Sequence, residues 1–486
     1  MNSTPEWIAR SVSRLRSADK ARDKADDKST AKAALDKAVT DGEAKPAKTD
    51  VPRTTHERLP ATLRRGNEAL SPRALRRLLA DLQEVVAPQV SEIEGGRRAQ
   101  AVAAWYAKAE PEERRDMWLL MCEQFAPDAT RFKSARQRYE AAAGTADEGQ
   151  AEISLRRALV SPRTRLLQRF AVFSDGMRFL VDLRAEILPL LKADKRLLPL
   201  DAELEHLFST WFDVAFLQLK RLSWDSPASL LEKLIKYEAV HDIKSWADLK
   251  NRLDSDRRCY GFFHPRLPDE PLIFVEVALL DKMSPSITPL LDEAAAPVDI
   301  ARATTAIFYS ISSTQTGLRG VSFGDSLIKH VVETLTAEFP RLRTFATLSP
   351  IPGLRAWLGK QAGAMLERLD DKRRAELGRA VGVEPQNGKD MATHLLAAID
   401  KPLDLDAKSP VRQMLLECAA YYLGRALQDG KPLDPVARFH LGNGARVERL
   451  NWAGDPSPKG LKQSYGLMVN YLYDLKRIDK HRSLLA

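Results

Sequence analysis

The sequence lacks long apolar runs, and it has few cysteines. In 486 residues, no apolar segment approaches the ~18 residues of a membrane-spanning helix, and the longest, Leu272 to Leu280, has the length of a strand. Three cysteines (Cys122, Cys259 and Cys418) lie far apart, which argues against a disulfide framework and indicates a reducing compartment. The remaining composition, 44% hydrophobic and 29% charged, is that of a globular protein and excludes wholesale disorder. The length favours two domains.

The net charge is positive but small for the length of the chain. Lys and Arg number 75 and Asp and Glu 66, which gives +9. Such an excess favours an anionic ligand only weakly. No basic stripe is interleaved with aromatic residues, which argues against a nucleic-acid-binding surface.

Residues 1–66 are predicted to form a tail outside the folded domains. From Ala18 to Asp50 the sequence has almost no large apolar residue, so it cannot bury enough surface to offset its ordering entropy. The first residues form a short basic amphipathic stretch, which would suit a targeting peptide. Acidic residues follow at once from Asp19, however, and they favour a tail without a targeting role.

Residues 67–206 are predicted to be all helical. Ser71-Pro72 and Ser161-Pro162 each combine a serine N-cap with proline at the first helical position. Leucines at helical spacing follow the first of these signals. No catalytic constellation appears in this region, so its expected role is packing or self-association.

From residue 207 the pattern changes to strands mixed with helices. Strands are predicted at 258–263, 272–279, 304–311 and 344–349, a helix at 325–338, a helical insertion at 360–430 and a final ordered stretch at 466–475. The proline-rich segment His264 to Pro271 is predicted to be the turn of a hairpin between the first two strands. Glu276 lies within an apolar strand, where it either is buried with a partner or faces solvent.

A glycine-rich segment, Gly317 to Asp325, lies between an expected strand and an expected helix. Its glycines allow a ligand to approach the backbone closely, and the following helix N-terminus presents N–H groups to an anion. Arg319 adds positive charge. The segment therefore fits a pyrophosphate cradle, with an ordinary connecting loop as the alternative. It is neither a Walker A motif nor a dinucleotide-binding fingerprint.

Several longer segments resemble malonyl-CoA decarboxylase. They are Phe308 to Gly320, Leu348 to Gly353, Phe439 to Trp452 and Gly466 to Tyr471. The resemblance implies an α+β fold, in which an all-helical oligomerisation domain (67–206) precedes a catalytic domain (207–486). This second domain would have a mixed sheet similar to GCN5-related acetyltransferases (the GNAT fold), with a helical insertion. The implied reaction converts malonyl-CoA to acetyl-CoA and CO2.

The resemblance also assigns the site residues. Ser349 and His440 match the family's catalytic serine and histidine, and Tyr473 matches a tyrosine important to the site. Asn443 and Asn451 are candidates to orient His440. The loop that would bind the pyrophosphate of coenzyme A comprises Arg319, Gly320, Val321, Ser322, Phe323, Gly324 and Asp325. Animal members carry an acidic residue at the position of Ser322, so only a backbone role is expected there.

The chemistry suggests a role for each catalytic residue. The reaction needs a held carboxylate, hydrogen-bond donors for the thioester oxygen and a proton for the α-carbon. We expect His440 to donate that proton and Ser349 to bind the carboxylate or relay a proton, because an unactivated hydroxyl is a poor base. No metal or organic cofactor is expected, since the thioester itself accepts the charge. Without the resemblance, a serine before proline is more often a cap or turn residue.

Two alternatives stay open at this point. The first is an acyltransferase of the same fold, which would need an acceptor amine, and the second is a non-enzymatic interaction protein. The expected partners are malonyl-CoA and further copies of the chain in a dimer or tetramer, with no nucleic acid and no membrane. The chain ends Ser483-Leu484-Leu485-Ala486 and not in the peroxisomal Ser-Lys-Leu address, so a cytoplasmic location is expected. Histidines such as His264 lack metal-site spacing.

Overall fold

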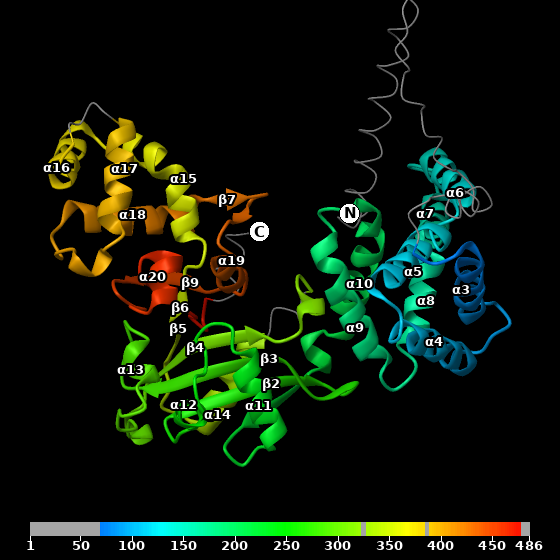
Figure 1. Ribbon diagram of the computed structural model, residues 1–486, viewed down its shortest axis with the longest axis horizontal. Helices are drawn as coiled ribbons and strands as arrows, with labels where there is room; N and C mark the ends of the chain where they lie inside the picture. The colour runs from blue at the N-terminus through cyan, green and yellow to red at the C-terminus, as the bar shows by residue number, and fades with distance from the viewer. Residues whose placement is uncertain (1–68, 322–326, 384–387, 478–486) are drawn as a thin grey trace, which may run out of the picture. The chain divides into compact units, whose positions relative to one another are not determined.

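The computed structural model describes residues 69–321, 327–383 and 388–477 (Figure 1). The expected tail at 1–66 lies outside the described residues. All three cysteines are free thiols, in agreement with the prediction that they form no disulfide framework, and all three are buried. Within the described ranges, no helix is long and apolar enough to cross a membrane.

The first part of the described chain is all helical, as predicted. Its helices are α3 (Pro72–Val85), α4 (Glu92–Tyr106), α5 (Pro111–Gln124), α6 (Ala129–Ala141), α7 (Glu148–Leu159), α8 (Pro162–Phe170), α9 (Gly176–Ile187) and α10 (Leu198–Trp211). The Ser71 hydroxyl caps α3 by accepting the Ala74 N–H. α8 starts at its predicted signal, but the Ser161 hydroxyl donates to Glu203 at 2.8 Å instead of capping the helix. The expected boundary at residue 206 falls inside α10, because that helix continues to Trp211.

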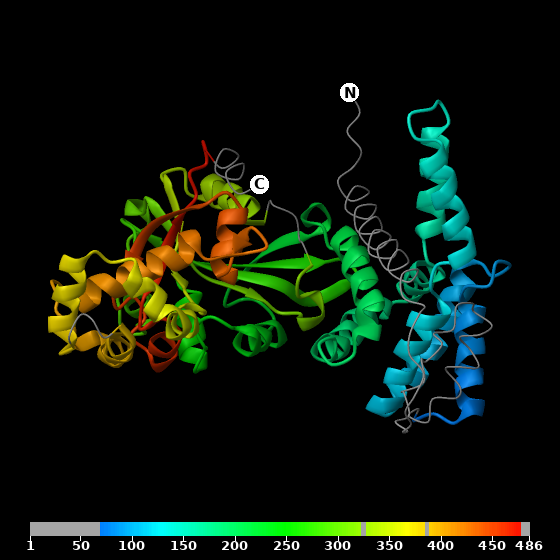
Figure 2. The same cartoon turned by 90° about the horizontal axis from the view of Figure 1, so that it is seen from above.

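Two of these helices form a separate antiparallel pair. Figure 2 shows α6 and α7 joined by a tight loop and extending together. A small core of their own, made of Ala135, Leu155 and Ala158, holds them together.

A mixed sheet follows the helical part. Its strands are β1 (Gln218–Leu222), β2 (Arg257–His264), β3 (Leu267–Leu280), β4 (Thr305–Ser313), β5 (Thr344–Thr347), β6 (Ser349–Pro350), β9 (Arg446–Asn451) and β10 (Met468–Leu472). The order is β1-β2-β3-β4-β5-β10-β6, and β9 also pairs with β10. Only β4 and β5 pair in parallel among the described strands, and α14 (Leu327–Glu338) lies between them in the sequence. This unit carries the glycine-rich segment, as predicted.

Helices cover the two faces of β1, β2 and β3. Cys259 and Phe263 of β2 face α11 (Ala228–Tyr237) and α12 (Trp246–Arg252), with which they share a small apolar cluster. Tyr260 and Phe262 of the same strand belong to the main core, together with the buried side of α14. This alternation is the two-residue period of a strand that is covered on both sides.

The hairpin between β2 and β3 is confirmed, but its predicted turn is too long. β3 begins at Leu267, so only residues 265 and 266 connect the strands. Pro271 pairs opposite Phe263 where the register shifts, and Asp269 has a positive φ of 59°. Local bulges thus accommodate the prolines within the paired strand.

The helical insertion is also confirmed. It comprises α15 (Leu354–Glu367), α16 (Asp371–Val381), α17 (Gly388–Ile399) and α18 (Pro410–Arg425), which cluster together in Figure 1. The remaining elements are α13 (Thr288–Leu291), β7 (Leu427–Gln428), β8 (Lys431–Pro432), α19 (Pro435–Gly442) and α20 (Pro458–Ser464). The fold is therefore α+β, with a helical part followed by a mixed-sheet part that contains a helical insertion.

Candidate active site

Ser349 is held beside β10 by the pairing of its strand β6, the last strand in the sheet order. It opens β6 opposite Val469 of β10 and is 6% exposed. Thr347 lies two positions earlier, so in extended chain its side chain points to the same side. The Ser349 hydroxyl donates to Thr347 Oγ1 at 2.8 Å, and Thr347 Oγ1 also accepts the N–H of Tyr471 at 3.2 Å.

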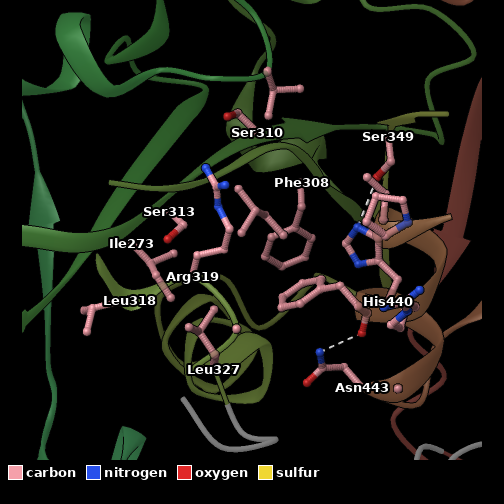
Figure 3. Close-up of a pocket in the computed structure, with 18 of the residues that line it drawn as sticks. Ile273, Phe308, Ser310, Ser313, Leu318, Arg319, Leu327, Ser349, His440 and Asn443 are labelled. Atoms are coloured by element: carbon pink, nitrogen blue, oxygen red, sulfur yellow. Dashed lines mark hydrogen bonds between the residues drawn. The ribbon is translucent and has the colours of Figure 1, made fainter. Parts of the chain in front are cut away.

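His440 reaches Ser349 from the short helix α19. Asp434 starts this helix by accepting the N–H groups of Val436 and Ala437, with Pro435 at the first helical position. His440 lies in the last turn, 3% exposed, with Nε2 at 3.2 Å from Ser349 Oγ. α19 therefore orients the imidazole toward the serine (Figure 3).

Two tyrosines, one in β10 and one directly after it, contact the other sides of the imidazole. The Tyr473 hydroxyl lies 2.8 Å from His440 Nδ1. The ring of Tyr471 stacks on the imidazole, with centroids 4.7 Å apart and planes inclined by 30°. Both ring nitrogens of His440 thus have partners, and neither partner is a carboxylate.

Burial sets the protonation state of these groups. It lowers the pKa of His440 to about 3 and raises the pKa of Tyr473 above its usual value. Both groups are therefore neutral near pH 7. Because the Ser349 hydroxyl donates to Thr347, its oxygen accepts from Nε2–H of His440, and Nδ1 then accepts from the Tyr473 hydroxyl.

A cavity of ≈ 870 Å³ opens in front of Ser349 and His440. Its walls are largely apolar, with contributions from Ile273, Phe308 and Leu318 (Figure 3). A volume of this size lies within the usual range for small-molecule sites. Tyr473 is not part of the lining and contacts the imidazole from behind.

The cavity lining carries positive charge. Arg319, Lys431 and Arg438 belong to it, and no carboxylate side chain does among the described residues. Two carbonyl oxygens, those of Pro432 and Leu433, orient the Arg438 guanidinium. The cavity thus suits a ligand that combines an apolar chain with negative charge.

The described part of the glycine-rich loop lies at this cavity. Arg319, Gly320 and Val321 all line it, and Gly320 has a positive φ of 82°. The other four predicted loop residues, Ser322, Phe323, Gly324 and Asp325, lie outside the described residues. A pyrophosphate cradle therefore stays a prediction.

Neither predicted asparagine bonds to His440. The Asn443 amide donates to the Phe439 carbonyl oxygen at 2.8 Å and lines the cavity. The Asn451 amide donates to Asn470 at 2.8 Å, within a buried network around β10. His440 is instead oriented by Tyr473 and Ser349, so an orienting role for the asparagines finds no contact in the structure.

Sequence reasoning missed Thr347, Tyr471 and the two cations of the β8–α19 segment. The spacing of Thr347 two residues before Ser349 in a predicted strand was a usable signal. Nothing in the local sequence indicated that Lys431 and Arg438 would line the same cavity as Arg319, because these segments are far apart in the sequence and are brought to one cavity by the fold. His264, which the sequence placed outside any metal-site spacing, packs on Phe212 and accepts the Arg266 N–H.

The described residues include no group of three or more His, Cys, Asp or Glu side chains placed to hold a metal ion. Glu276, the carboxylate within the apolar strand, is paired with Arg252. The two side chains are 3.1 Å apart and each residue is 1% exposed. The sequence left the environment of Glu276 open, and the buried alternative is correct.

Comparison with known proteins gives a consistent assignment. The sequence profile of the malonyl-CoA decarboxylase N-terminal domain matches residues 125–212, and that of the C-terminal domain matches residues 215–486. Mitochondrial malonyl-CoA decarboxylase from Anser anser anser is 37% identical over 333 residues, which are 66% of this chain and 66% of that protein. The rat protein is 38% identical over 340 residues, 67% of this chain and 68% of that protein. The matched segments thus span about two thirds of these relatives.

Solved structures agree with the sequence matches. A crystal structure of malonyl-CoA decarboxylase from Rhodopseudomonas palustris has a TM-score of 0.71 and 41% identity, covering 85% of this chain and 96% of that one. The Agrobacterium vitis protein gives 0.72 and 38%, covering 84% and 96%. With the C-terminal profile matching more than half of its length, this chain belongs to the malonyl-CoA decarboxylase family.

Proposed function

We propose that this chain converts malonyl-CoA to acetyl-CoA and CO2. The observation that carries the proposal is the Tyr473–His440–Ser349 hydrogen-bonded series at the end of an apolar cavity with a basic lining. Family membership supports malonyl-CoA as the substrate. The cavity provides space for its malonyl end beside the neutral side chains of Ser349 and His440.

The proposed reaction begins with loss of CO2. The bond between the α-carbon and the carboxyl carbon breaks, and its electron pair moves into the thioester to give an enolate. An apolar cavity favours this step, because charge that is localised on the carboxylate becomes spread over the enolate and a neutral molecule leaves. When substrate is bound, the Ser349 hydroxyl can turn from Thr347 and donate a hydrogen bond to the developing oxyanion, which leaves the Nε2–H of His440 for the α-carbon.

Proton delivery completes the reaction. We assign the proton to His440, whose neutral imidazole is a stronger acid than the α-carbon of a thioester. As Nε2 loses its proton to the α-carbon, Nδ1 can take the hydroxyl proton of Tyr473, 2.8 Å away. Solvent then restores the proton of the tyrosine. The thioester is the electron sink throughout, so the proposed chemistry needs no metal or organic cofactor.

The test is to incubate purified protein with malonyl-CoA alone and to separate the products by chromatography. The wild type should form acetyl-CoA, and His440→Ala should lose nearly all turnover. His394→Ala, which replaces an exposed histidine of α17, is the matched control and should retain activity. Folded wild type that forms no acetyl-CoA from malonyl-CoA alone, but releases free coenzyme A and an acylated amine when an acceptor amine is added, would reject decarboxylation in favour of acyl transfer.

Two further properties are proposed, the first of them on the resemblance alone. We expect a homo-oligomer that forms through the helical part, and a cytoplasmic location. Light scattering of the full chain tests the first, and fractionation of the source cells tests the second. A monomeric active enzyme, or enzyme recovered with an organelle, would contradict the respective expectation.

A further inference from the structure

One face of α9, in the helical part, packs directly on the segment that leads into the acyl-CoA loop. Arg178, Val181 and Arg184 are spaced three residues apart, so they lie on one side of the helix. All three contact residues between Gln315 and Arg319, on and beside the short turn η5 (Thr316–Leu318). The helical part is therefore in contact with the proposed substrate loop.

Arg184 makes the most extensive of these contacts. It is 1% exposed, and its Nη1 donates to the carbonyl oxygens of Gly317 at 2.8 Å and Arg319 at 2.9 Å. Its Nε donates to Asp201 of α10 at 2.8 Å, and Nη2 lies 3.4 Å from Glu205. The two carboxylates fix the guanidinium from the side of the helices, and the two carbonyls fix the turn on the guanidinium.

The two other contacts hold the same turn. A Cβ atom on Gly317 would lie 1.9 Å from the carbonyl oxygen of Val181, so the turn touches the backbone of α9 and only glycine fits. Arg178 Nη1 donates to Gln315 Oε1 at 2.6 Å. The turn thus has little freedom to move away from α9.

These contacts decide which backbone amide faces the cavity. In a trans peptide the C=O and the next N–H point in opposite directions, so holding the Arg319 carbonyl directs the Gly320 N–H away from Arg184. Within the described residues, the amides of Leu318, Arg319 and Val321 donate to backbone carbonyls, and Gly320 is not among these donors. Gly320 itself lines the cavity. Its N–H is therefore placed to meet a ligand anion.

We propose that Arg184 is a positioning residue of the acyl-CoA site, which holds the turn so that the Gly320 amide faces a phosphate group of coenzyme A. The proposal rests on the proposed function only in naming coenzyme A as the ligand. If Arg184 holds the turn in this way, α9 is a structural part of the substrate site. Arg184 itself is not placed to touch the substrate.

The structure offers a matched control. Arg163 of α8 is 5% exposed, and its Nε lies 2.6 Å from Glu203. Its Nη1 donates to the carbonyl oxygens of Met121 at 3.3 Å and Cys122 at 3.1 Å. It therefore resembles Arg184 in bonding to two carbonyls and, through Nε, to a carboxylate, although it has no counterpart of the Glu205 contact, and it lies inside the helical part and away from the loop.

The experiment compares Arg184→Lys with Arg163→Lys in the full-length chain. Lysine keeps the charge but lacks the planar fork that holds a carboxylate and two carbonyls together. We measure the dissociation constant of coenzyme A by calorimetry, and KM and kcat for malonyl-CoA by acetyl-CoA formation. Arg184→Lys should raise the dissociation constant and KM about tenfold with kcat within about twofold of wild type. Arg163→Lys should leave all three near wild-type values.

Unchanged affinity in folded Arg184→Lys would overturn the proposal, and so would an equal loss of affinity in both variants. If Arg184→Lys does not fold, the KM of Arg178→Ala is measured instead. The Arg178 side chain is 29% exposed, so its removal leaves no buried charge without a partner. A raised KM then supports the role of α9, and an unchanged KM overturns it. A wild type that binds coenzyme A without forming acetyl-CoA would reject the proposed function, while the calorimetric comparison would still test Arg184.

Discussion

At the scale of single residues, burial and hydrogen-bond direction together determine what the site can do. His440 has no carboxylate partner that would favour the imidazolium, and its lowered pKa keeps it neutral. Triosephosphate isomerase likewise uses a neutral histidine as its electrophile, although there the pKa is lowered by a helix N-terminus. In this chain the direction of the hydrogen bonds depends on Thr347, which accepts from Ser349 and so leaves the serine oxygen free to accept from Nε2–H.

Replacing Thr347 with valine tests this dependence. The change keeps the branched shape but removes the acceptor of the Ser349 hydroxyl. That hydroxyl would then donate to Nε2, which selects the other imidazole tautomer and withdraws the transferable proton. We expect kcat to fall about tenfold to a hundredfold, with KM little changed. Steady-state kinetics should show most of the rate restored in Thr347→Ser, which regains the acceptor. A valine variant with wild-type kcat would contradict the assigned directions.

Some of this site could be predicted from the residues, and some could not. Ser349, His440 and Tyr473 were identified by resemblance, and the structure brings the three into one hydrogen-bonded series. Their catalytic roles stay predictions. Asn443 and Asn451 were named from the matching stretch around His440, but Asn443 bonds to the Phe439 carbonyl of α19 and Asn451 bonds to Asn470 of β10. A matching motif does not indicate which way an amide points.

At the scale of elements, the substrate turn depends on the close approach of α9. Gly317 is held against the backbone of that helix, where a methyl group would overlap a carbonyl oxygen. Gly359 of α15 is the opposite case, since a Cβ atom there would meet nothing within 4 Å. Glycine is required at the first position and is only a weak helix former at the second.

The two glycines therefore give opposite expectations for alanine. Gly317→Ala should move the turn and raise KM for malonyl-CoA about tenfold or more, with a loss of thermal stability. Gly359→Ala should raise the free energy of unfolding by about 0.5–1 kcal/mol and leave KM unchanged. Kinetics and thermal melts of both variants test this, and an unaltered KM in Gly317→Ala would show that the turn tolerates displacement.

The elements themselves were largely predictable, because their signals are local. Serine and proline mark the starts of α3 and α8, and apolar runs mark β2, β3 and β4. The length of β3 was not predictable, because bulges allow a proline-rich segment to stay paired. Residue 206, the expected boundary, lies inside α10, because that helix continues to Trp211.

At the scale of the whole molecule, a buried cluster of titratable side chains connects helix α12 to strand β3. Arg252 of α12 bonds to Asp248 of the same helix at 2.8 Å and to Glu276 of β3 at 3.1 Å. Burial and, to a smaller extent, the nearby Glu238 raise the pKa of Glu276 to about 8, although Arg252 acts in the other direction. The ordinary value for glutamate is 4.5.

This shift makes stability depend on pH. Between pH 4.5 and about 8 the folded state binds a proton at Glu276 that the unfolded state does not, so the free energy of unfolding falls as pH rises. The contribution is at most ~1.4 kcal/mol per pH unit. Glu276→Gln should flatten this dependence and leave Arg252 paired with Asp248. Urea unfolding at several pH values tests the expectation, and equal slopes for the variant and wild type would contradict it.

The position of β10 has a consequence for how the chain acquires activity as it is synthesised. This strand pairs with β5, β6 and β9, and the residue that follows it, Tyr473, completes the contact to His440. Tyr471 and Thr347, which bond to each other, are 124 positions apart in the sequence. A nascent chain that has already emerged through Ser349 therefore still lacks the strand that joins β5 to β6, and His440 and Tyr473 have yet to be translated. Catalysis would begin only after the ribosome has delivered this late strand, so interrupted synthesis should yield inactive fragments.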